Sequence, residues 1–451
     1  MPPPTLAQYS LQVCDDCGAE YGERDARVQC AACGGLLALR HAPPDAGGAE
    51  LRARFDARLA SAAPAYVADG AAAARASGVW RFRELLFPGV ADLDVVSQPE
   101  GNTPLLRRAP VSRWAGVDAL FLKHDGYNPT GSFKDRGMTT ALTQARRAGA
   151  TAVACASTGN TSASLAAYAA LAGVPALVMV PAAAGGAQQV ALGKLAQTLA
   201  YGARTLLVRG DFDACLRLAR ESAEGLGVYL ANSINPFRVE GQKSVAFEIL
   251  QQLGWDAPEW IVLPAGNLGN TSAVGAALRD AVRAGLIART PRVASVQAAG
   301  AAPFARGFRE GFVARRTVRA ATVATAIKIG DPASWDRAVR VIRETDGVVL
   351  DVTDDELLEA KAVVDAAGVG CEPASAASVA GARRLVRDGL AKPGDRVVAI
   401  LTGHVLKDPG TLLDYHRAGS AAPLANAPLE IDPAVSEVER VLSADRAARS
   451  A

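Results

Sequence analysis

The fold of this chain is decided by the stretch Gly131-Ser132-Phe133-Lys134-Asp135-Arg136-Gly137. The residues just before it, Pro129-Thr130-Gly131, predict a turn, because proline fixes φ and glycine permits unusual backbone angles. The residues after Gly137 can continue as a helix, which places Lys134 at a helix start. An amine held there and partly removed from water has a lowered pKa and can attack an aldehyde to form a Schiff base. The alternative is a solvated lysine between charged neighbours.

Apolar strands alternate with helices around this stretch. Continuous apolar strands of this kind predict a parallel sheet that helices cover on both faces. In such open α/β sheets, ligands bind at the carboxyl ends of the strands. Pro181 is expected to stop one strand. We expect the strands at residues 121–123, 151–155, 174–180, 260–263 and 396–401.

Three polar loops follow these strands. In Gly266-Asn267-Leu268-Gly269-Asn270, the glycines allow successive amides to converge on an anion, and a helix start adds a favourable dipole. In Ser157-Thr158-Gly159-Asn160, the amide can bond a ring oxygen and the hydroxyls can hold a carboxylate. The Thr402 hydroxyl can face a pyridine nitrogen. The alternatives are an ordinary turn, a helix cap and a threonine at a strand end.

A further polar cluster contains Asn232, Ser233 and Arg238. An arginine fork with a serine and an asparagine beside it suits a substrate phosphate, although Arg238 could also be a surface charge. With Lys134 and the three loops, this cluster gives the parts that a phosphorylated aromatic aldehyde cofactor needs: an amine, a phosphate cradle, and partners for the ring oxygen and ring nitrogen.

Four of the seven cysteines form two CxxC pairs, Cys14 with Cys17 and Cys30 with Cys33. Two such pairs supply four thiolates for a tetrahedral Zn²⁺ ion, and a site filled by four sulfurs has no open position. We therefore expect a structural zinc ribbon rather than unpaired or disulfide-bonded cysteines. The other three cysteines lie in apolar segments and are expected in the core.

The 451 residues carry a formal net charge of +2, which gives no reason to expect a nucleic-acid or membrane partner. The N-terminus MPPPTLAQYS lacks the features of a secretory signal, so we expect a cytoplasmic protein. The expected domains are a ribbon, a linker with a short helix, a catalytic body with a small subdomain at about 110–230, and a peripheral tail. Their bounds are 1–40, 41–79, 80–419 and 420–451.

Residues 80–415 resemble the threonine synthase family, which belongs to the fold type II pyridoxal-phosphate enzymes. This resemblance implies an α/β fold with two open, mostly parallel sheets wrapped by helices, a small N-terminal zinc ribbon and a homodimer. One departure is Val405, where the family often has glycine. The motifs that carry the resemblance are NPTGSFKDRG (128–137), CASTGNTSAS (155–164), NSINPFRVEGQK (232–243), PAGNLGN (264–270), CEPASAAS (371–378) and LTGHVLKDP (401–409).

The resemblance implies that Lys134 carries pyridoxal 5′-phosphate and moves protons, with Thr158 as a second catalytic residue. Asn160 would bond the ring oxygen, and Thr402 would face the ring nitrogen. The phosphate cradle would consist of Gly266, Asn267, Leu268, Gly269 and Asn270. The substrate would be bound by Ser157, Thr158, Asn232, Ser233, Arg238 and Asn267.

The implied reaction converts O-phospho-L-homoserine and water to L-threonine and phosphate. On the same fold, a cysteate synthase acting on phosphoserine and a threonine or serine dehydratase are alternatives. A dehydratase needs no second phosphate site, so Arg238 would matter little to it. From a different class, a non-catalytic scaffold could use the zinc ribbon for protein contacts.

Overall fold

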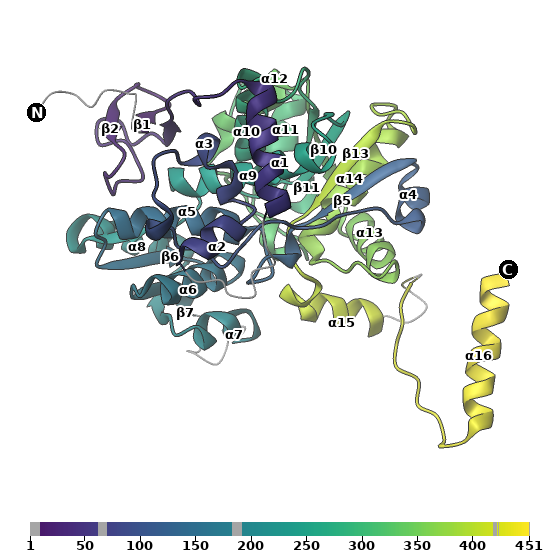
Figure 1. Ribbon diagram of the computed structural model, residues 1–451. Coiled ribbons are helices and arrows are strands. Elements are labelled where there is room, and N and C mark those ends of the chain that lie inside the picture. The colour runs from purple at the N-terminus through teal and green to yellow at the C-terminus, as the bar shows by residue number, and fades with distance from the viewer. Residues whose placement is uncertain (1–9, 62–69, 183–191, 418–421, 423, 451) are drawn as a thin grey trace, which may run out of the picture. The chain divides into compact units, whose positions relative to one another are not determined.

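The computed structural model describes residues 10–61, 70–182, 192–417, 422 and 424–450. The chain falls into two compact units, Met1–Pro409 and Gly410–Ala451. The first unit contains three sheets and most of the helices (Figure 1). The N-terminal residues 1–9, for which we expect no secretory signal, lie outside the described residues.

The largest sheet has six strands in the order β12-β11-β10-β13-β5-β4. Every neighbouring pair is parallel except β4 and β5, which are antiparallel. The parallel sheet that the apolar runs predict is therefore confirmed here. The strands are β4 (Leu105–Leu106), β5 (Ala119–His124), β10 (Trp260–Pro264), β11 (Arg292–Ala298), β12 (Val348–Val352) and β13 (Arg396–Leu401).

Helices cover both faces of this sheet because both faces are apolar. Along β10, Ile261 and Leu263 pack into one core and Trp260 and Val262 pack into another. The first core contains side chains of α1 (Gly48–Ser61), α3 (Arg83–Leu86), α9 (Pro236–Gln252) and α10 (Gly269–Arg283). The second contains side chains of α4 (Ala109–Ala115), α13 (Asp354–Ala366) and α14 (Pro373–Arg387). Three further helices are α2 (Gly70–Ala76), α11 (Pro303–Arg309) and α12 (Trp335–Glu344).

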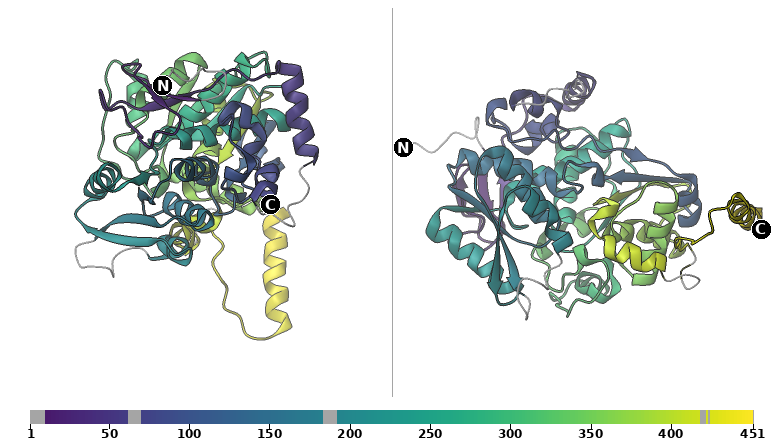
Figure 2. Two further views of the ribbon diagram at one scale, coloured as in Figure 1. Left: turned by 60° about the vertical axis from the view of Figure 1, so that its left-hand side comes forward. Right: turned by 90° about the horizontal axis from the view of Figure 1, so that it is seen from below.

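The second sheet has four parallel strands in the order β8-β7-β6-β9. It lies beside the six-stranded sheet in the view from below (Figure 2). One core joins it to α5 (Lys134–Arg147), α6 (Asn160–Ala172) and α7 (Leu192–Ala200), and another joins it to α8 (Phe212–Leu226). The strands are β6 (Ala152–Ala156), β7 (Ala176–Ala182), β8 (Arg204–Arg209) and β9 (Val228–Leu230).

The expectation that Pro181 stops its strand is wrong. Strand β7 continues to Ala182, and Pro181 pairs with Val208 of β8. The pairing of β7 with β6 ends at Met179, so β7 has a strand on only one side at Pro181. A proline is tolerated there because no second neighbour needs its missing N–H.

A third, antiparallel sheet contains β1 (Leu11–Cys14), β2 (Glu20–Gly22) and β3 (Leu37–Arg40). The helices at the C-terminal end of the chain are α15 (Pro409–Arg417), which begins at the last residue of the first unit, and α16 (Val435–Ser450) in the second unit. The cysteines outside the two CxxC pairs, Cys155, Cys215 and Cys371, are fully buried as expected.

Helices α5 and α9 pack with their backbones in close approach. A Cβ atom at Gly137 of α5 would lie 2.6 Å from the Arg238 carbonyl oxygen, and one at Gly241 of α9 would overlap the Arg136 carbonyl oxygen. Glycine at both positions therefore lets the two helices come together. This contact matters because Lys134 begins α5 and Arg238 lies in the first turn of α9.

Candidate active site

Lys134 is held by a loop that is pinned to the end of β13. Gly131 adopts a φ of 83°, and the next residues pair with the segment after the strand: Ser132 forms a bridge with Gly403, and the Phe133 N–H donates to the Thr402 carbonyl over 2.9 Å. Helix α5 then begins at Lys134. The backbone of Lys134 is therefore held on one side by the loop bonded to β13 and on the other side by helix α5.

A buried network of charges fixes the same end of α5. The guanidinium of Arg136 donates to Asp125 at 2.7 Å and to Glu248 of α9 at 2.8 Å. Lys123 on β5 donates to the same Glu248 carboxylate at 2.6 Å. These side chains are almost completely buried, and breaking a buried pair of this kind leaves an uncompensated charge. The network therefore ties the start of α5 to β5 and α9.

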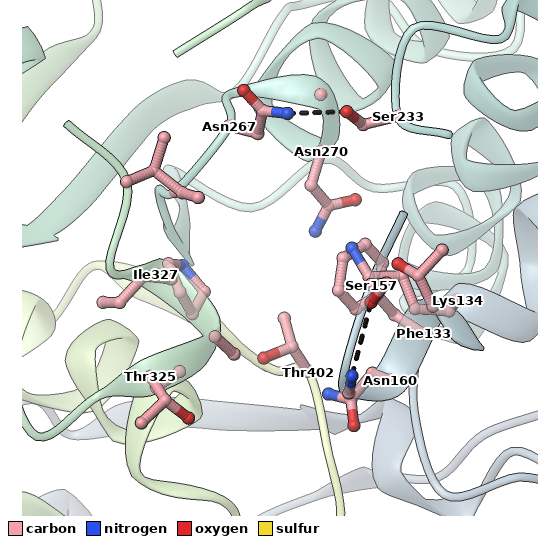
Figure 3. Close-up of a pocket in the computed structure, with 18 of the residues that line it drawn as sticks. Phe133, Lys134, Ser157, Asn160, Ser233, Asn267, Asn270, Thr325, Ile327 and Thr402 are labelled. Carbon is pink, nitrogen blue, oxygen red and sulfur yellow. Dashed lines mark hydrogen bonds between the residues drawn. The ribbon is translucent and has the colours of Figure 1, made fainter. Parts of the chain in front are cut away.

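The Lys134 amine faces a cavity of about 310 Å³ (Figure 3). Burial lowers the pKa of Lys134 to about 7; the positive charge of Arg238 acts in the same direction, and Glu372 opposes it. The cavity is lined by every residue that the sequence analysis predicts to bind the cofactor or the substrate. These are Lys134, Ser157, Thr158, Asn160, Asn232, Ser233, Arg238, Gly266, Asn267, Leu268, Gly269, Asn270 and Thr402.

The glycine-rich loop between β10 and α10 forms one wall of this cavity. Leu268 adopts a left-handed conformation with a φ of 64°, which is uncommon for a residue with a side chain. The Asn267 amide donates to the Ser233 hydroxyl at 2.6 Å and accepts from the Ala333 N–H at 2.6 Å. Neither polar side-chain atom of Asn270 has a hydrogen-bond partner within the described part of the chain, although both are buried.

Arg238 supplies a buried positive charge. Its side chain is 1% exposed, and only Nη1 has a partner, the Ala231 carbonyl at 3.0 Å. Among the described residues, nothing bonds Nε or Nη2. Burial lowers the pKa of Arg238 to about 10, so the group stays charged at neutral pH. A buried guanidinium with free donors is costly unless an anion binds it, which fits a phosphate.

The loop after β6 brings Ser157, Thr158 and Asn160 to the start of α6. The Ser157 hydroxyl accepts from the Gly159 N–H at 3.3 Å, so one hydroxyl shapes the loop. Asn232 bonds the backbone of Ala156 with both its amide oxygen and its amide nitrogen. It therefore holds the end of β6, and one amide hydrogen remains for a ligand.

The cavity also contains residues to which sequence reasoning assigned no role, above all Glu372 and Lys407. Glu372 is buried and accepts from the Asn160 amide at 2.9 Å and from the Thr402 hydroxyl at 3.1 Å. Lys407 bonds Gln197 of α7. Both residues lie in motifs that carry the family resemblance. A glutamate just before a proline also suits a helix start, so nothing in the sequence specifically indicates that Glu372 lies in the site.

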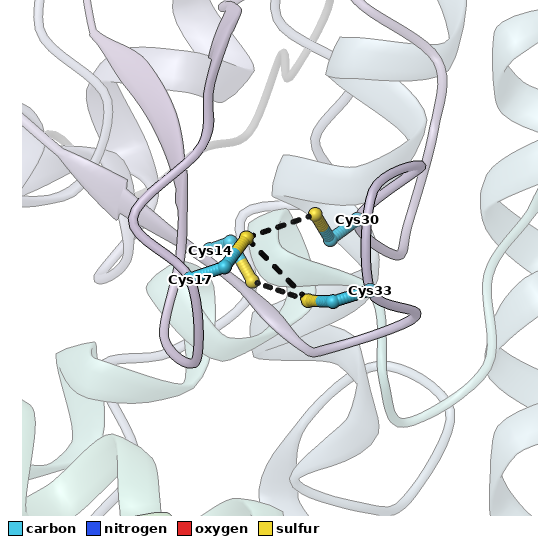
Figure 4. Close-up of side chains that lie close together, drawn as sticks. All are labelled: Cys14, Cys17, Cys30 and Cys33. Carbon is cyan, nitrogen blue, oxygen red and sulfur yellow. Dashed lines mark hydrogen bonds between the residues drawn. The ribbon is translucent and has the colours of Figure 1, made fainter.

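The four cysteines of the CxxC pairs converge at the edge of the antiparallel sheet (Figure 4). Their sulfur atoms all lie within 4.8 Å of one another, and the pairs Cys14–Cys33, Cys17–Cys30 and Cys17–Cys33 are 3.5 Å apart. Zinc–sulfur bonds of about 2.3 Å place tetrahedral thiolates about 3.8 Å apart. The four sulfurs therefore fit a tetrahedral metal ion.

The comparison with protein families gives the class. The sequence profile described as "Pyridoxal-phosphate dependent enzyme" matches residues 96–403. The orphaned donors of Arg238 and Asn270 around one cavity fit a phosphorylated ligand. The chain belongs to the pyridoxal-phosphate dependent enzyme family.

Curated relatives narrow the class. The chain is 42% identical over 403 residues to a threonine synthase of Methanosarcina acetivorans, which covers 89% of this chain and 93% of that protein. It is 48% identical over 317 residues to a threonine synthase of Synechocystis, covering 70% of this chain and 79% of that protein. Within the pyridoxal-phosphate enzymes, the chain is thus a member of the threonine synthase family.

Solved structures share the fold at low sequence identity. The threonine synthase of Escherichia coli matches 96% of this chain and 94% of its own with a TM-score of 0.67 and 18% identity. A fungal L-serine ammonia-lyase from Rhizomucor miehei matches 72% of this chain and 99% of its own with a TM-score of 0.60 and 20% identity. These likenesses confirm the predicted fold type. No helix in the described ranges is long and apolar enough to cross a membrane.

Proposed function

We propose that this enzyme converts O-phospho-L-homoserine and water to L-threonine and phosphate. The observation that carries the proposal is that two groups suited to anions line one cavity: the glycine-rich loop at 266–270, and the Arg238 guanidinium, whose Nε and Nη2 have no partner among the described residues. The reaction needs both, because cofactor and substrate each bring a phosphate. The similarity to curated threonine synthases supports the same reaction.

In this proposal the loop 266–270 holds the cofactor phosphate with its backbone amides, Asn160 bonds the ring oxygen and Thr402 meets the ring nitrogen. When bound, pyridoxal 5′-phosphate supplies a ring that stabilises negative charge at the substrate Cα. Lys134 would hold the cofactor. When its amine is free, the low pKa keeps that amine neutral, so that it can take a proton from the substrate Cα and return it.

The remaining residues orient the substrate. Ser157 and Thr158 lie just before the N-terminus of α6, where hydroxyls and amides suit the substrate carboxylate. Thr158 has the proposed role of a second catalytic residue. Arg238 holds the phosphate as it leaves, with Asn232, Ser233 and Asn267 beside it. A guanidinium in a dry site stabilises developing negative charge, which is worth about 3–4 kcal/mol by comparison with other preorganised donors.

The substrate is tested by measuring phosphate release from O-phospho-L-homoserine and from O-phospho-L-serine with the same preparation. We expect rapid release from the first, with threonine as the product, and little from the second. Preferential turnover of phosphoserine would show a cysteate synthase-like enzyme instead. Lys134→Ala should abolish both the visible absorbance of the bound cofactor and turnover, whereas the exposed Lys392→Ala should change neither.

We further propose that Cys14, Cys17, Cys30 and Cys33 bind a structural zinc ion. The sulfur geometry supports this, and the Tyr21 hydroxyl lies 3.1 Å from Cys30 Sγ while accepting from the Ala31 N–H, so its proton can stabilise the thiolate. Metal analysis should find about one zinc per chain. Cys14→Ser should lose it and the buried control Cys215→Ala should keep it; equal zinc in both variants would rule out the ribbon site.

We also propose a cytoplasmic homodimer. Reducing conditions would keep the four thiols available for zinc, and the family resemblance carries the expectation of two copies. Light scattering of the purified protein measures its mass, and a monomeric mass would contradict the proposed homodimer.

A further inference from the structure

Glu372 occupies an unusual place in the cavity. It immediately precedes α14, where an acidic side chain could cap its own helix, but it makes no such bond. Instead its two carboxyl oxygens take separate partners: Oε2 accepts from the Asn160 amide at 2.9 Å, and Oε1 accepts from the Thr402 hydroxyl at 3.1 Å. One buried carboxyl thus joins the start of α6 to the end of β13.

The backbone is shaped around this carboxyl. The Glu372 N–H donates to the Gly403 carbonyl at 3.0 Å, and a Cβ atom at Gly403 would overlap the Glu372 carboxyl group. A residue other than glycine at 403 would therefore displace Glu372. Burial raises the pKa of Glu372, while Asn160, Thr402 and the nearby charges of Lys407 and Lys134 oppose that rise.

We propose that Glu372 is a positioning residue that orients both side chains facing the cofactor ring, the Asn160 amide and the Thr402 hydroxyl. This inference rests on the proposed roles of Asn160 and Thr402 at the ring oxygen and ring nitrogen. Glu372 itself need not touch the cofactor.

The effect on Asn160 follows from the donors available. A carboxylate oxygen only accepts, so the nitrogen of the Asn160 amide must face Glu372. That nitrogen has a second hydrogen, which is then free to donate to the oxygen of a bound ring. Without Glu372, the amide could turn over and present its oxygen instead, which would repel a phenolate.

The effect on Thr402 concerns a single proton. The Ser375 hydroxyl accepts from the Gly403 N–H and lies 2.9 Å from Thr402 Oγ1, so it can give its own proton to Thr402. Thr402 can then donate to Glu372 or to a ring nitrogen, but not to both. An ionised Glu372 accepts this hydrogen bond from Thr402, so that only an oxygen lone pair of Thr402 faces the ring. A protonated Glu372 leaves the Thr402 O–H free to donate to the ring nitrogen.

The test uses the full-length protein and pyridoxal 5′-phosphate itself. Glu372→Gln keeps the size of the side chain but places an amide beside Thr402, and Glu372→Ala removes both bonds. We expect the cofactor dissociation constant of the apo-protein to rise about tenfold in Glu372→Ala. The absorption maximum of the bound cofactor should shift in Glu372→Gln. The control Glu359→Gln, on α13 outside the cavity, should match the wild type.

A double variant separates orientation from simple loss of contact. If Glu372 acts by turning the Asn160 amide, Asn160→Ala should weaken cofactor binding much less in the Glu372→Ala background than in the wild type. Thermal melting of Glu372→Gln checks that the variant folds. Wild-type affinity and an unshifted spectrum in both Glu372 variants would overturn the inference.

Separate variants distinguish a wrong role for Asn160 and Thr402 from a wrong role for Glu372. If Asn160→Ala and Thr402→Ala leave affinity and spectrum unchanged, their proposed roles are wrong, and the inference falls with them. If those two variants change the cofactor and the Glu372 variants do not, the inference about Glu372 alone is wrong. If the wild type binds no cofactor, the proposed function itself fails.

Discussion

At the scale of single residues, the site depends on groups that are poorly satisfied until a ligand arrives. Within the described part of the chain, two nitrogens of the buried Arg238 side chain and both polar side-chain atoms of the buried Asn270 have no hydrogen-bond partner. Such groups cost free energy in the empty protein and become favourable contacts when an anion binds. The cavity is therefore built for ligands at some cost in stability.

Replacing Arg238 tests that idea. Arg238→Met should stabilise the ligand-free protein by about 1–3 kcal/mol, because it removes a buried charge that has no counter-ion among the residues that the structure describes. Turnover of O-phospho-L-homoserine should fall at least about 100-fold, since the leaving phosphate loses its partner. Chemical denaturation and steady-state kinetics measure the two effects. A variant that is both less stable and fully active would contradict the assignment of Arg238 to a phosphate.

The pKa of Lys134 gives a pH dependence. The folded pKa of about 7 is lower than the ordinary value of 10.5, so the amine is neutral in the folded protein but protonated in the unfolded chain between those values. The unfolded state then binds more protons, and this group's contribution to stability rises with pH through that range. Only the neutral amine attacks an aldehyde, so the rate of cofactor capture by apo-protein should rise with pH and level off above about 7.

A substitution of Arg238 tests the origin of the low pKa of Lys134. Its charge lowers the pKa of Lys134, so Arg238→Met should move the midpoint of the pH–rate profile to higher pH. The exposed Arg283→Met should leave it unchanged. Stopped-flow absorbance measures the capture rate, and a wild-type midpoint near 10 would show that the amine is not perturbed.

At the scale of secondary-structure elements, α5 and α9 are the pair that sets the distance between Lys134 and Arg238. Gly241→Ala should destabilise the protein by about 1–3 kcal/mol, because the new methyl group overlaps the Arg136 carbonyl and forces the helices apart. The exposed helical Gly225 has nothing near its missing Cβ, so Gly225→Ala should be neutral or stabilising. Denaturant unfolding compares the two, and equal stabilities would show that the α5–α9 contact is not close.

At the scale of the whole chain, the ribbon is joined to the helices of the site. Glu23 bonds Arg147 of α5 at 2.7 Å, and Asp15, between two cysteines, pairs with Arg337 of α12. His41, the first residue after the ribbon, bonds Glu240 of α9 at 3.1 Å. The segment just before α12 lies next to the loop at 266–270, because the Ala333 N–H donates to the side-chain oxygen of Asn267. Loss of the proposed zinc ion is therefore expected to lower the stability of α5, α9 and α12 and their surroundings as well.

Much of this architecture could be predicted from the sequence because its cues are local. Apolar strands followed by polar loops predicted both the parallel sheets and the loops at their carboxyl ends, and the CxxC spacing predicted the sulfur cluster. Glu372 could not be given a role this way, because its partners lie 212 and 30 residues away in the chain. Pro181 was misjudged because its effect depends on how far the neighbouring strand β6 extends.

In the proposed reaction, the substrate loses its phosphate by elimination and gains its hydroxyl from water at the next carbon. Turnover of O-phospho-L-homoserine in water enriched in oxygen-18 tests this most directly, with mass spectrometry of both products. We expect one labelled oxygen in threonine and none in the released phosphate, because the bond between Cγ and oxygen breaks. Labelled phosphate together with homoserine would show simple ester hydrolysis and would contradict it.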